Sequence, residues 1–504
     1  MRSTFMGLEI AKRGMNTQQG ALYTTGHNIA NANTPGYTRQ RVNFVQTQPY
    51  PAASMNRPQI PGQMGTGVEA GSIQRVRESF LDLQYRNENN KLGYWESRAT
   101  ALSKMEDIMN EPSENGLSAV MGEFWQSLQD LSVHPEDEGA RKVVLQRGQA
   151  VADTFHYLSD SLNGIKKDYG AQVDASVKEI NSLLEQIANV NKQIGEIEPH
   201  GYLPNDLYDE RDRLVDELSQ YINIEVERKD SGGNPSPLAE GLYEIKLVNN
   251  DGSKSTLVSK SNFGKISDTG VKDGNPESIS TLEVIDSEGN SKSITVPDFS
   301  QGKLRGLMEA YGYEDNGGSK GIYIEMLNDL DKMATAFANA FNAQHREGHI
   351  LDKNNSPSAK GSDFFTINSG ERPAKGLILA IKNTNEIAAS ADGTSGNGKN
   401  AIELAGIQGE ATPELGNATI NSFYEGMIGK LGVDALQANR LTANSAVLRQ
   451  SVDERKQSVS SVALDEEMTN MIKFQHAYNA AARNITVVDE MLDKIINGMG
   501  TVGR

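Results

Sequence analysis

LDEEMTNMIKFQHAYNAAARNITVVDEMLDKII, residues 464–496, carries one stripe of positions separated by alternating steps of three and four residues. A spacing that averages 3.5 residues draws a single narrow line along a helix and is typical of a coiled-coil seam. We therefore interpret this segment as one coiled-coil helix. The stripe consists of Leu464, Met468, Met471, Gln475, Tyr478, Ala482, Ile485, Asp489, Leu492 and Ile496.

The opposite end of the chain repeats this pattern. Residues 4–31 are expected to form a helix that stops near Asn33, because Thr34 precedes Pro35 and Pro35-Gly36 suits the middle of a type II turn. Residues 37–45 then fit an extended segment, and residues 46–67 an irregular connection. The N-terminal stripe consists of Leu8, Ala11, Met15, Gln18, Leu22, Thr25 and Ile29.

The two terminal stripes are predicted to be partners. The first 50 residues are basic and the C-terminal stripe is acidic, and an isolated helix of about 28 residues is marginal in water. Each buried Leu or Ile contributes about 1.5–3 kcal/mol, so we expect the ends to become ordered by docking onto neighbouring copies. Two ordinary amphipathic helices on a globular core fit the same periodicity. The predicted assembly contacts are Leu8, Met15, Leu22 and Ile29 against Leu464, Met471, Tyr478, Ile485 and Leu492.

Length and composition exclude several classes of protein. A chain of 504 residues needs several cores, about three or four domains. The net charge of −18 argues against nucleic acid as a partner. The sequence has no apolar run of about 18 residues and no signal peptide pattern, so we expect no membrane span and no cleaved leader. The absence of cysteine excludes disulfides and thiolate chemistry.

Between the ends, apolar residues at helical spacing predict a long-helix bundle, with helices over 117–131, 143–194, 207–222, 324–341 and 431–459. Residues 240–297 change to alternating patterns, and turns at Asn250-Asp251-Gly252 and Glu288-Gly289-Asn290 predict two β-hairpins. The predicted fold is multidomain and mainly α, with terminal coiled-coil helices, the bundle and a small all-β insertion. The predicted domains are 1–36 with 462–504, 37–239 with 300–461, and 240–299.

The run NIANANTPGY, residues 28–37, resembles the signature of bacterial flagellar rod, hook and hook-associated proteins. TRQRV, residues 38–42, is most similar to the family of hook-associated protein 1. The segments PNDLYDERD (204–212) and GKLRGL (302–307) resemble stretches peculiar to hook-associated proteins, and residues 464–483 resemble their C-terminal helix. The motif residues singled out are Asn31, Asn33, Pro35, Gly36 and Tyr37.

This resemblance implies a structural subunit at the junction between flagellar hook and filament. It implies export in an unfolded state through the flagellar type III apparatus with a chaperone, polymerisation at the tip, and an extracellular location. The implied partners are further copies in a ring or short tube, the hook protein, and a second junction protein or flagellin. It implies no membrane partner, no nucleic acid, no enzymatic activity and no cofactor.

Two motifs imitate catalytic or binding sites. His345-Arg-Glu-Gly-His349 spaces two histidines four apart, but Glu347 stands one place later than the zinc protease pattern requires. Residues 393–400 nearly spell a phosphate-binding loop, but Asn400 replaces the hydroxyl that must reach magnesium. We therefore expect no catalytic, metal-binding or cofactor-binding residues, and interpret both segments as structural.

Three other functions compete with this interpretation. A flagellar hook or distal rod subunit would share the terminal motifs, although the segments at 204 and 302 argue against it. A secreted surface enzyme on a flagellar-type scaffold depends on the histidine pair alone, and metal analysis would identify it. An intracellular coiled-coil scaffold would never be exported.

The seam hypothesis predicts the effect of Ile485→Asp. The body should fold normally, but incorporation into filaments should be lost because a charge would be buried in the seam. Circular dichroism of the purified variant and electron microscopy of cells that make it would measure both effects. Filaments of normal number on such cells would contradict the seam assignment.

Overall fold

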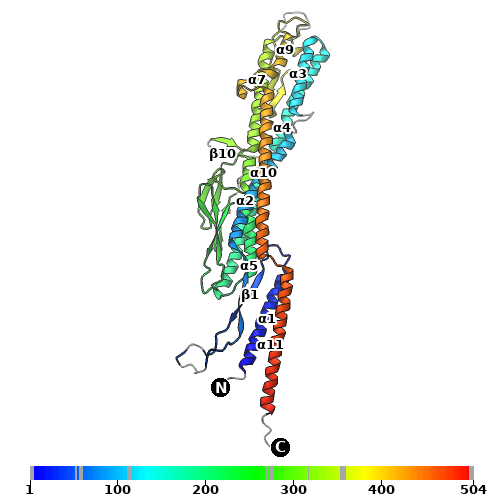
Figure 1. Ribbon diagram of the computed structural model, residues 1–504. Coiled ribbons are helices and arrows are strands. Elements are labelled where there is room, and N and C mark those ends of the chain that lie inside the picture. The colour runs from blue at the N-terminus through cyan, green and yellow to red at the C-terminus, as the bar shows by residue number, and fades with distance from the viewer. Residues whose placement is uncertain are drawn as a thin grey trace, which may run out of the picture.

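The computed structural model describes residues 5–51, 54–55, 61–109, 116–267, 269, 271, 277–315, 317–351 and 359–498. The molecule is elongated, with a pair of terminal helices at one end, a bundle of long helices along its length and the sheets of residues 224–295 on one side (Figure 1). Residues 1–4 and 499–504, the outer ends of the predicted terminal domain, lie outside the described residues.

Helices dominate the architecture, which confirms the predicted mainly α fold. The α-helices are α1 Met6–Ala30, α2 Ser79–Met109, α3 Leu117–Val133, α4 Glu138–Ile197, α5 Asn205–Tyr221, α6 Lys303–Tyr311, α7 Ile322–Glu347, α8 Pro373–Gly376, α9 Lys399–Gly406, α10 Ile420–Ser460 and α11 Leu464–Gly498. Short 3₁₀ turns are η1 Glu198–His200, η2 Thr384–Glu386, η3 Ile407–Gly409 and η4 Pro413–Leu415.

Five small sheets accompany the described helices, and all their strand pairs are antiparallel. Their orders are β1-β2, β10-β11, β12-β13, β3-β4-β5-β6 and β7-β8-β9. The strands are β1 Gln40–Gln46, β2 Val68–Arg75, β3 Ile224–Lys229, β4 Leu242–Val248, β5 Lys254–Ser259, β6 Asn262–Phe263, β7 Lys265–Ile266, β8 Thr281–Ile285, β9 Ser291–Thr295, β10 Tyr313–Asp315, β11 Gly318–Lys320, β12 Phe365–Ile367 and β13 Leu377–Leu379.

Helix α4 runs for 60 residues and confirms the single long helix predicted over 143–194. It begins where the Asp137 carboxylate accepts the backbone N–H groups of Gly139 and Ala140 at 3.0 and 3.2 Å. It ends just before Pro199, which cannot continue an α-helix. A buried apolar stripe along its whole length packs against α3, α5, α6 and α7, so α4 is the spine of the body.

Both predicted hairpins are present, as β4-β5 and β8-β9, and each belongs to a larger sheet. Strand β3, which precedes the predicted insertion, pairs with β4. Buried Asn191 of α4 bonds both the N–H and the C=O of Tyr243, and Asn181 does the same for Ile266. The sheets are therefore fastened to the spine by paired amide hydrogen bonds, and their apolar faces continue the helical core.

Several elements differ from the sequence expectation. Helix α1 ends at Ala30 rather than near Asn33, α10 begins at Ile420 rather than 431, and α2 was not predicted as a helix. In addition, the described residues of the segment 46–67 belong to a hairpin arm, because Gln46 pairs with Val68 and Tyr50 with Met64. The described residues of this arm, which are 40–51, 54–55 and 61–75, lie beside the terminal helices (Figure 1).

A cluster of aromatic rings lies in the core where α3, α7 and β12 meet. Phe124 is fully buried and its ring contacts the aromatic rings of five neighbours. Those neighbours are Trp125, Phe337, Phe341, Phe364 and Phe365.

Removing this ring should destabilise the body. Phe124→Ala is expected to lower the free energy of unfolding by about 3–5 kcal/mol, because a large cavity opens among rigid rings. Val133→Ala at the end of the same helix is the control; Val133 is 69% exposed, and its change should stay within about 0.5 kcal/mol. Thermal or denaturant unfolding measures both, and equal losses would contradict the packing argument.

Candidate assembly interface

The terminal helices α1 and α11 lie side by side and run in opposite directions (Figure 1). Gly7 lies against Val488, and Gly14 lies against Ala481. Small residues at these points let the helix backbones approach closely. The chain itself therefore brings its two predicted seams together as an antiparallel pair that extends beyond the body.

All nine predicted contact residues can be placed on this pair. Leu8, Met15, Leu22 and Ile29 of α1 are half-buried, as are Met471, Tyr478, Ile485 and Leu492 of α11, whereas Leu464 is 47% exposed. The fully buried positions of α1 are smaller and more polar than predicted: Ala11, Thr17, Ala21, Thr24, Thr25 and Asn28. The structure is of a single chain, so contact of these stripes with neighbouring copies stays a prediction.

Much apolar surface on the pair is left uncovered. Glu467 is the only buried residue among those described in α11, because a two-helix pair covers one side of each helix. Large apolar side chains are exposed on its remaining sides and on α10, which lies next in line. They are Leu464, Met468, Ile472, Val487, Met491, Ile495 and Ile496 on α11, and Val433, Leu436, Val447 and Leu448 on α10.

The motif residues form a compact turn that joins α1 to β1. Buried Asn28 donates to the Gln40 carbonyl at 2.8 Å and accepts the Gln40 N–H at 3.0 Å, so its side chain substitutes for a strand partner. The Tyr37 hydroxyl also donates to Asn28, at 2.8 Å. Burial, reinforced by Asp206 and Asp209, raises the pKa of Tyr37 and keeps this hydroxyl protonated.

The turn itself depends on Pro35-Gly36. The Tyr37 N–H donates to the Thr34 carbonyl, and Gly36 has φ +82°, a conformation that favours glycine in a type II turn. Asn31 bonds the His27 carbonyl and the Thr34 hydroxyl, which closes the end of α1. Asn33 and Pro35 are exposed. The motif thus forms the turn that reverses the chain direction between α1 and β1.

Arg39 couples this turn to the start of α11. Its guanidinium donates to both carboxylate oxygens of Glu466, at 2.8 and 2.9 Å, and to buried Glu467 at 2.7 Å. Its backbone N–H donates to the carbonyl of Ser460, the last residue of α10. One residue therefore ties β1, α10 and α11 together where the body meets the terminal pair.

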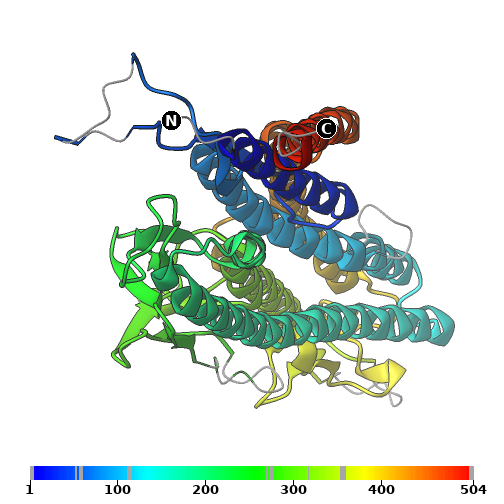
Figure 2. The ribbon, with the colours of Figure 1, turned by 90° about the horizontal axis from the view of Figure 1, so that it is seen from below.

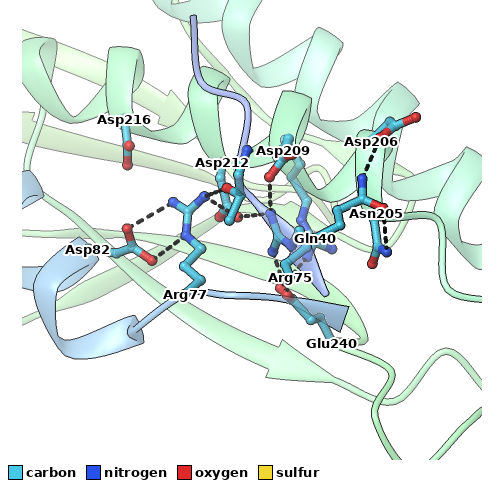
Figure 3. A network of polar contacts seen from close by, with 12 residues as sticks. Gln40, Arg75, Arg77, Asp82, Asn205, Asp206, Asp209, Asp212, Asp216 and Glu240 are labelled. Atoms are coloured by element: carbon cyan, nitrogen blue, oxygen red, sulfur yellow. Dashed lines mark hydrogen bonds and ion pairs between the residues drawn. The ribbon is translucent and has the colours of Figure 1, made fainter. Parts of the chain in front are cut away.

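A buried ion cluster lies on the body side of this joint (Figure 3). Asp212 of α5 is 1% exposed. Its carboxylate faces Arg75 at 3.0 Å, Arg77 at 3.1 Å and Arg86 at 3.2 Å. The Tyr243 hydroxyl donates to the same carboxylate at 2.8 Å. Asp212 thus contacts side chains from β2, from α2 and the segment before it, and from β4.

Further carboxylates surround these arginines. Arg75 also contacts Asp209 at 2.7 Å and Glu240, while Arg77 pairs with Asp82 at 2.6 Å. Asp209 in turn accepts the backbone N–H of Thr38 at 2.9 Å, next to the motif turn. The segment 204–212, which sequence similarity marked without a role, therefore forms one half of this buried ion cluster, and residues 75–86 form the other half.

Opposing effects set the charge of Asp212. Burial alone raises the pKa of a carboxyl group, but the guanidinium groups of Arg77, Arg75 and Arg86 outweigh burial and hold the pKa of Asp212 well below its usual range. Burial also opposes the charge of Arg86, yet Asp216 and Asp212 raise the pKa of Arg86. These shifts favour the charged forms of Asp212 and Arg86 at neutral pH.

The segments that imitate catalytic sites are engaged in packing. His345 is fully buried, Nδ1 donates to the Ser362 carbonyl at 2.6 Å, and Nε2 accepts the Ala388 N–H at 3.0 Å. Burial lowers the pKa of His345. Asn400 bonds the Ala388 carbonyl and Gln344. Within the described ranges no group of histidine and carboxylate side chains has the geometry of a metal site, and no helix there is long and apolar enough to cross a membrane.

Replacing Asp212 tests the contribution of the buried ion cluster to stability. Asp212→Asn should cost about 3–5 kcal/mol at pH 7, because three buried guanidinium groups lose their shared counter-charge. Since the folded pKa is depressed, this stabilisation is present above about pH 4 and is lost as the pH falls further. Wild-type unfolding free energy should therefore drop more steeply with acid than that of the variant; parallel curves would contradict the assignment.

Comparison with known proteins agrees with this arrangement. Residues 102–365 match the model of the flagellar hook-associated protein FlgK helical domain. Residues 8–38 match that of the flagella basal body rod protein, and residues 457–498 that of the flagellar basal body rod FlgEFG protein C-terminal region. Both rod-protein matches fall on the terminal pair and its joint.

Whole-chain relatives carry one name. Flagellar hook-associated protein 1 of Bacillus subtilis is 45% identical over 517 aligned positions, covering 100% of both chains. The protein of that name from Salmonella typhimurium is 25% identical, covering 97% of this chain and 98% of its own. A solved structure of the flagellar hook junction protein FlgK from Burkholderia pseudomallei has the same fold, with TM-score 0.61, 15% identity, and coverage of 76% of this chain and 100% of that one. The chain belongs to the flagellar hook-associated protein 1 family.

Proposed function

We propose that this chain is a non-catalytic structural subunit of the junction between the flagellar hook and the filament. In this proposal it is exported unfolded, polymerises at the growing tip and remains outside the cell. The names of its relatives support the location, since they are called hook-associated proteins and, for the Burkholderia pseudomallei structure, a hook junction protein. The full-length similarity to the Bacillus subtilis protein supports carrying this role to the whole chain.

The uncovered apolar side chains of α11 and α10 carry the proposal. Leu464, Met468 and Ile472 follow one another at four-residue steps, so they lie on one side of α11. Contiguous exposed apolar patches of this kind mark interaction sites. Neighbouring copies in a ring or short tube would cover them, which is the self-association expected of a filament subunit.

The remaining partners follow from a position within the axial structure. Hook protein would contact one end of the ring and a second junction protein or flagellin the other. A chaperone would hold the terminal helices before passage through the type III apparatus. A chain without cysteine passes through such a route without forming wrong disulfides.

The competing functions have less support. A hook or rod subunit fits the matches at the two ends but not the FlgK helical domain match over 102–365. A surface enzyme depended on the pair His345 and His349, and both ring nitrogens of His345 bond the backbone. Deletion of the gene tests the main proposal: cells should carry hooks without filaments, and filaments on such cells would overturn it.

A matched pair of substitutions separates assembly from folding. Ile472→Asp should leave thermal unfolding unchanged, since Ile472 is 54% exposed in the single chain, yet it should abolish motility because neighbours bury it. Ile402→Asp on α9, at the far end of the molecule, is the control, and Ile402 is 56% exposed (Figure 1). Swimming assays and melting curves measure both; normal motility of the Ile472 variant would contradict the assembly face.

A further inference from the structure

A polar cleft opens on the side of α2 that carries Asn87, Asn90, Lys91 and Tyr94. These residues are spaced by steps of three and four along the helix, so they share one of its faces. The cleft has a volume of about 500 Å³, within the range of about 300–1,000 Å³ that is typical of small-molecule sites.

The rest of the lining comes from three segments that are distant from α2 in the sequence. Asn223 directly precedes β3, Asn250 lies in the turn between β4 and β5, and Ser300 and Gln301 precede α6, which carries Arg305. Figure 1 and Figure 2 both place the sheets of residues 224–295 on one side of the bundle. The fold therefore gathers four chain segments around one space where this side meets α2.

The cleft has a buried floor and an exposed rim. Asn90, Tyr94 and Ser300 are buried, with exposed fractions of 5%, 8% and 3%. Lys91 and Gln301 are exposed. A ligand on this floor would therefore be partly removed from water and still reach the exposed side chains around it.

Two of the amides are held in fixed orientations. Asn90 Nδ2 donates to the Ser219 carbonyl at 3.0 Å, and Asn250 Nδ2 donates to the Pro297 carbonyl at 3.0 Å. Their Oδ1 atoms are left as acceptors. Three further side-chain amides make no hydrogen bond to other described residues: those of Asn87, Asn223 and Gln301.

Two cations complete the lining. Lys91 Nζ contacts Glu88 at 2.8 Å, and Arg305 donates to Glu309 at 2.8 Å and to the Phe299 carbonyl at 2.7 Å. These bonds position both groups, and each keeps further N–H donors. The chain as a whole has a net charge of −18, yet none of the described residues that line the cleft is acidic.

We propose that this cleft binds an acidic sugar, a ring that carries neighbouring hydroxyl groups and one carboxylate. Amides suit hydroxyl groups, because each amide offers both donors and an acceptor, and Lys91 and Arg305 suit the carboxylate. The described lining has no aliphatic side chain for an apolar ligand and no carboxylate for a metal ion. Such binding goes beyond the junction role and does not depend on it.

Saturation-transfer NMR of the purified full-length chain with glucuronate tests this site. Glucuronate should bind in about the millimolar range expected for a ligand of its size. Glucose, which lacks the carboxylate, should bind about tenfold more weakly, and an equal concentration of sulfate should not displace glucuronate. No transfer to glucuronate, equal binding of glucose, or displacement by sulfate would overturn the acidic-sugar assignment.

Substitutions locate the binding on the protein. Lys91→Gln should weaken glucuronate binding about tenfold and leave glucose binding unchanged, because only a charged donor is lost. Lys332→Gln is the matched control: Lys332 pairs with Asp329 three residues earlier, as Lys91 pairs with Glu88. It should change neither affinity.

Asn87→Asp supplies a second test at unchanged side-chain size. The new carboxylate should repel glucuronate and abolish its binding, whereas melting curves should match those of the wild type because Asn87 is exposed. Unchanged glucuronate binding in both the Lys91 and the Asn87 variant, or an equal loss in the Lys332 control, would overturn the placement of the sugar in this cleft.

Discussion

Two paired helices cannot bury the apolar side chains on all their sides, so α1 and α11 leave apolar side chains exposed in the single chain. The face of α1 that packs closely is built from small residues such as Ala11 and Ala21. Met468 and Met491 of α11 remain exposed on its other sides. The spine helix α4 has less of this deficit, because helices and sheets that share one continuous core pack along its length. In the single chain, burial of apolar side chains is thus more complete along α4 than at the terminal pair.

Hydrogen bonds and ion pairs connect the terminal pair to the body. Arg39 links the end of α10 to the start of α11, and Asp209 accepts the N–H of Thr38 one residue away. Behind them, Asp212 gathers three guanidinium groups from segments distant in sequence. Removing one member of such a buried cluster is strongly destabilising, because the remaining charges are left uncompensated. A subunit that connects two structures needs a defined angle between its assembling end and its body.

Much of the fold was predictable because its signals are local. The long helix α4 and both hairpins follow from apolar spacing and from turns at Gly252 and Gly289. Helix α2 was not predicted because its buried face includes Asp82, Arg86 and Asn89, which pair with α5 and with Arg77. Polar residues that are buried through long-range ion pairs look like surface residues in a sequence. The buried ion cluster was missed for the same reason, whereas the terminal stripes were visible from spacing alone. The arm was missed because residues 46–67 are rich in Gln, Pro, Gly and Asn and show no apolar period.

Amide hydrogen exchange tests the central claim most directly, since it compares local stability along one chain. In the purified monomer, amides of α11 should exchange far faster than those of α4, and in assembled flagella the two helices should be similarly protected. Slow exchange throughout α11 in the monomer, equal to that of α4, would show that the terminal pair is stable without neighbours and would contradict the account.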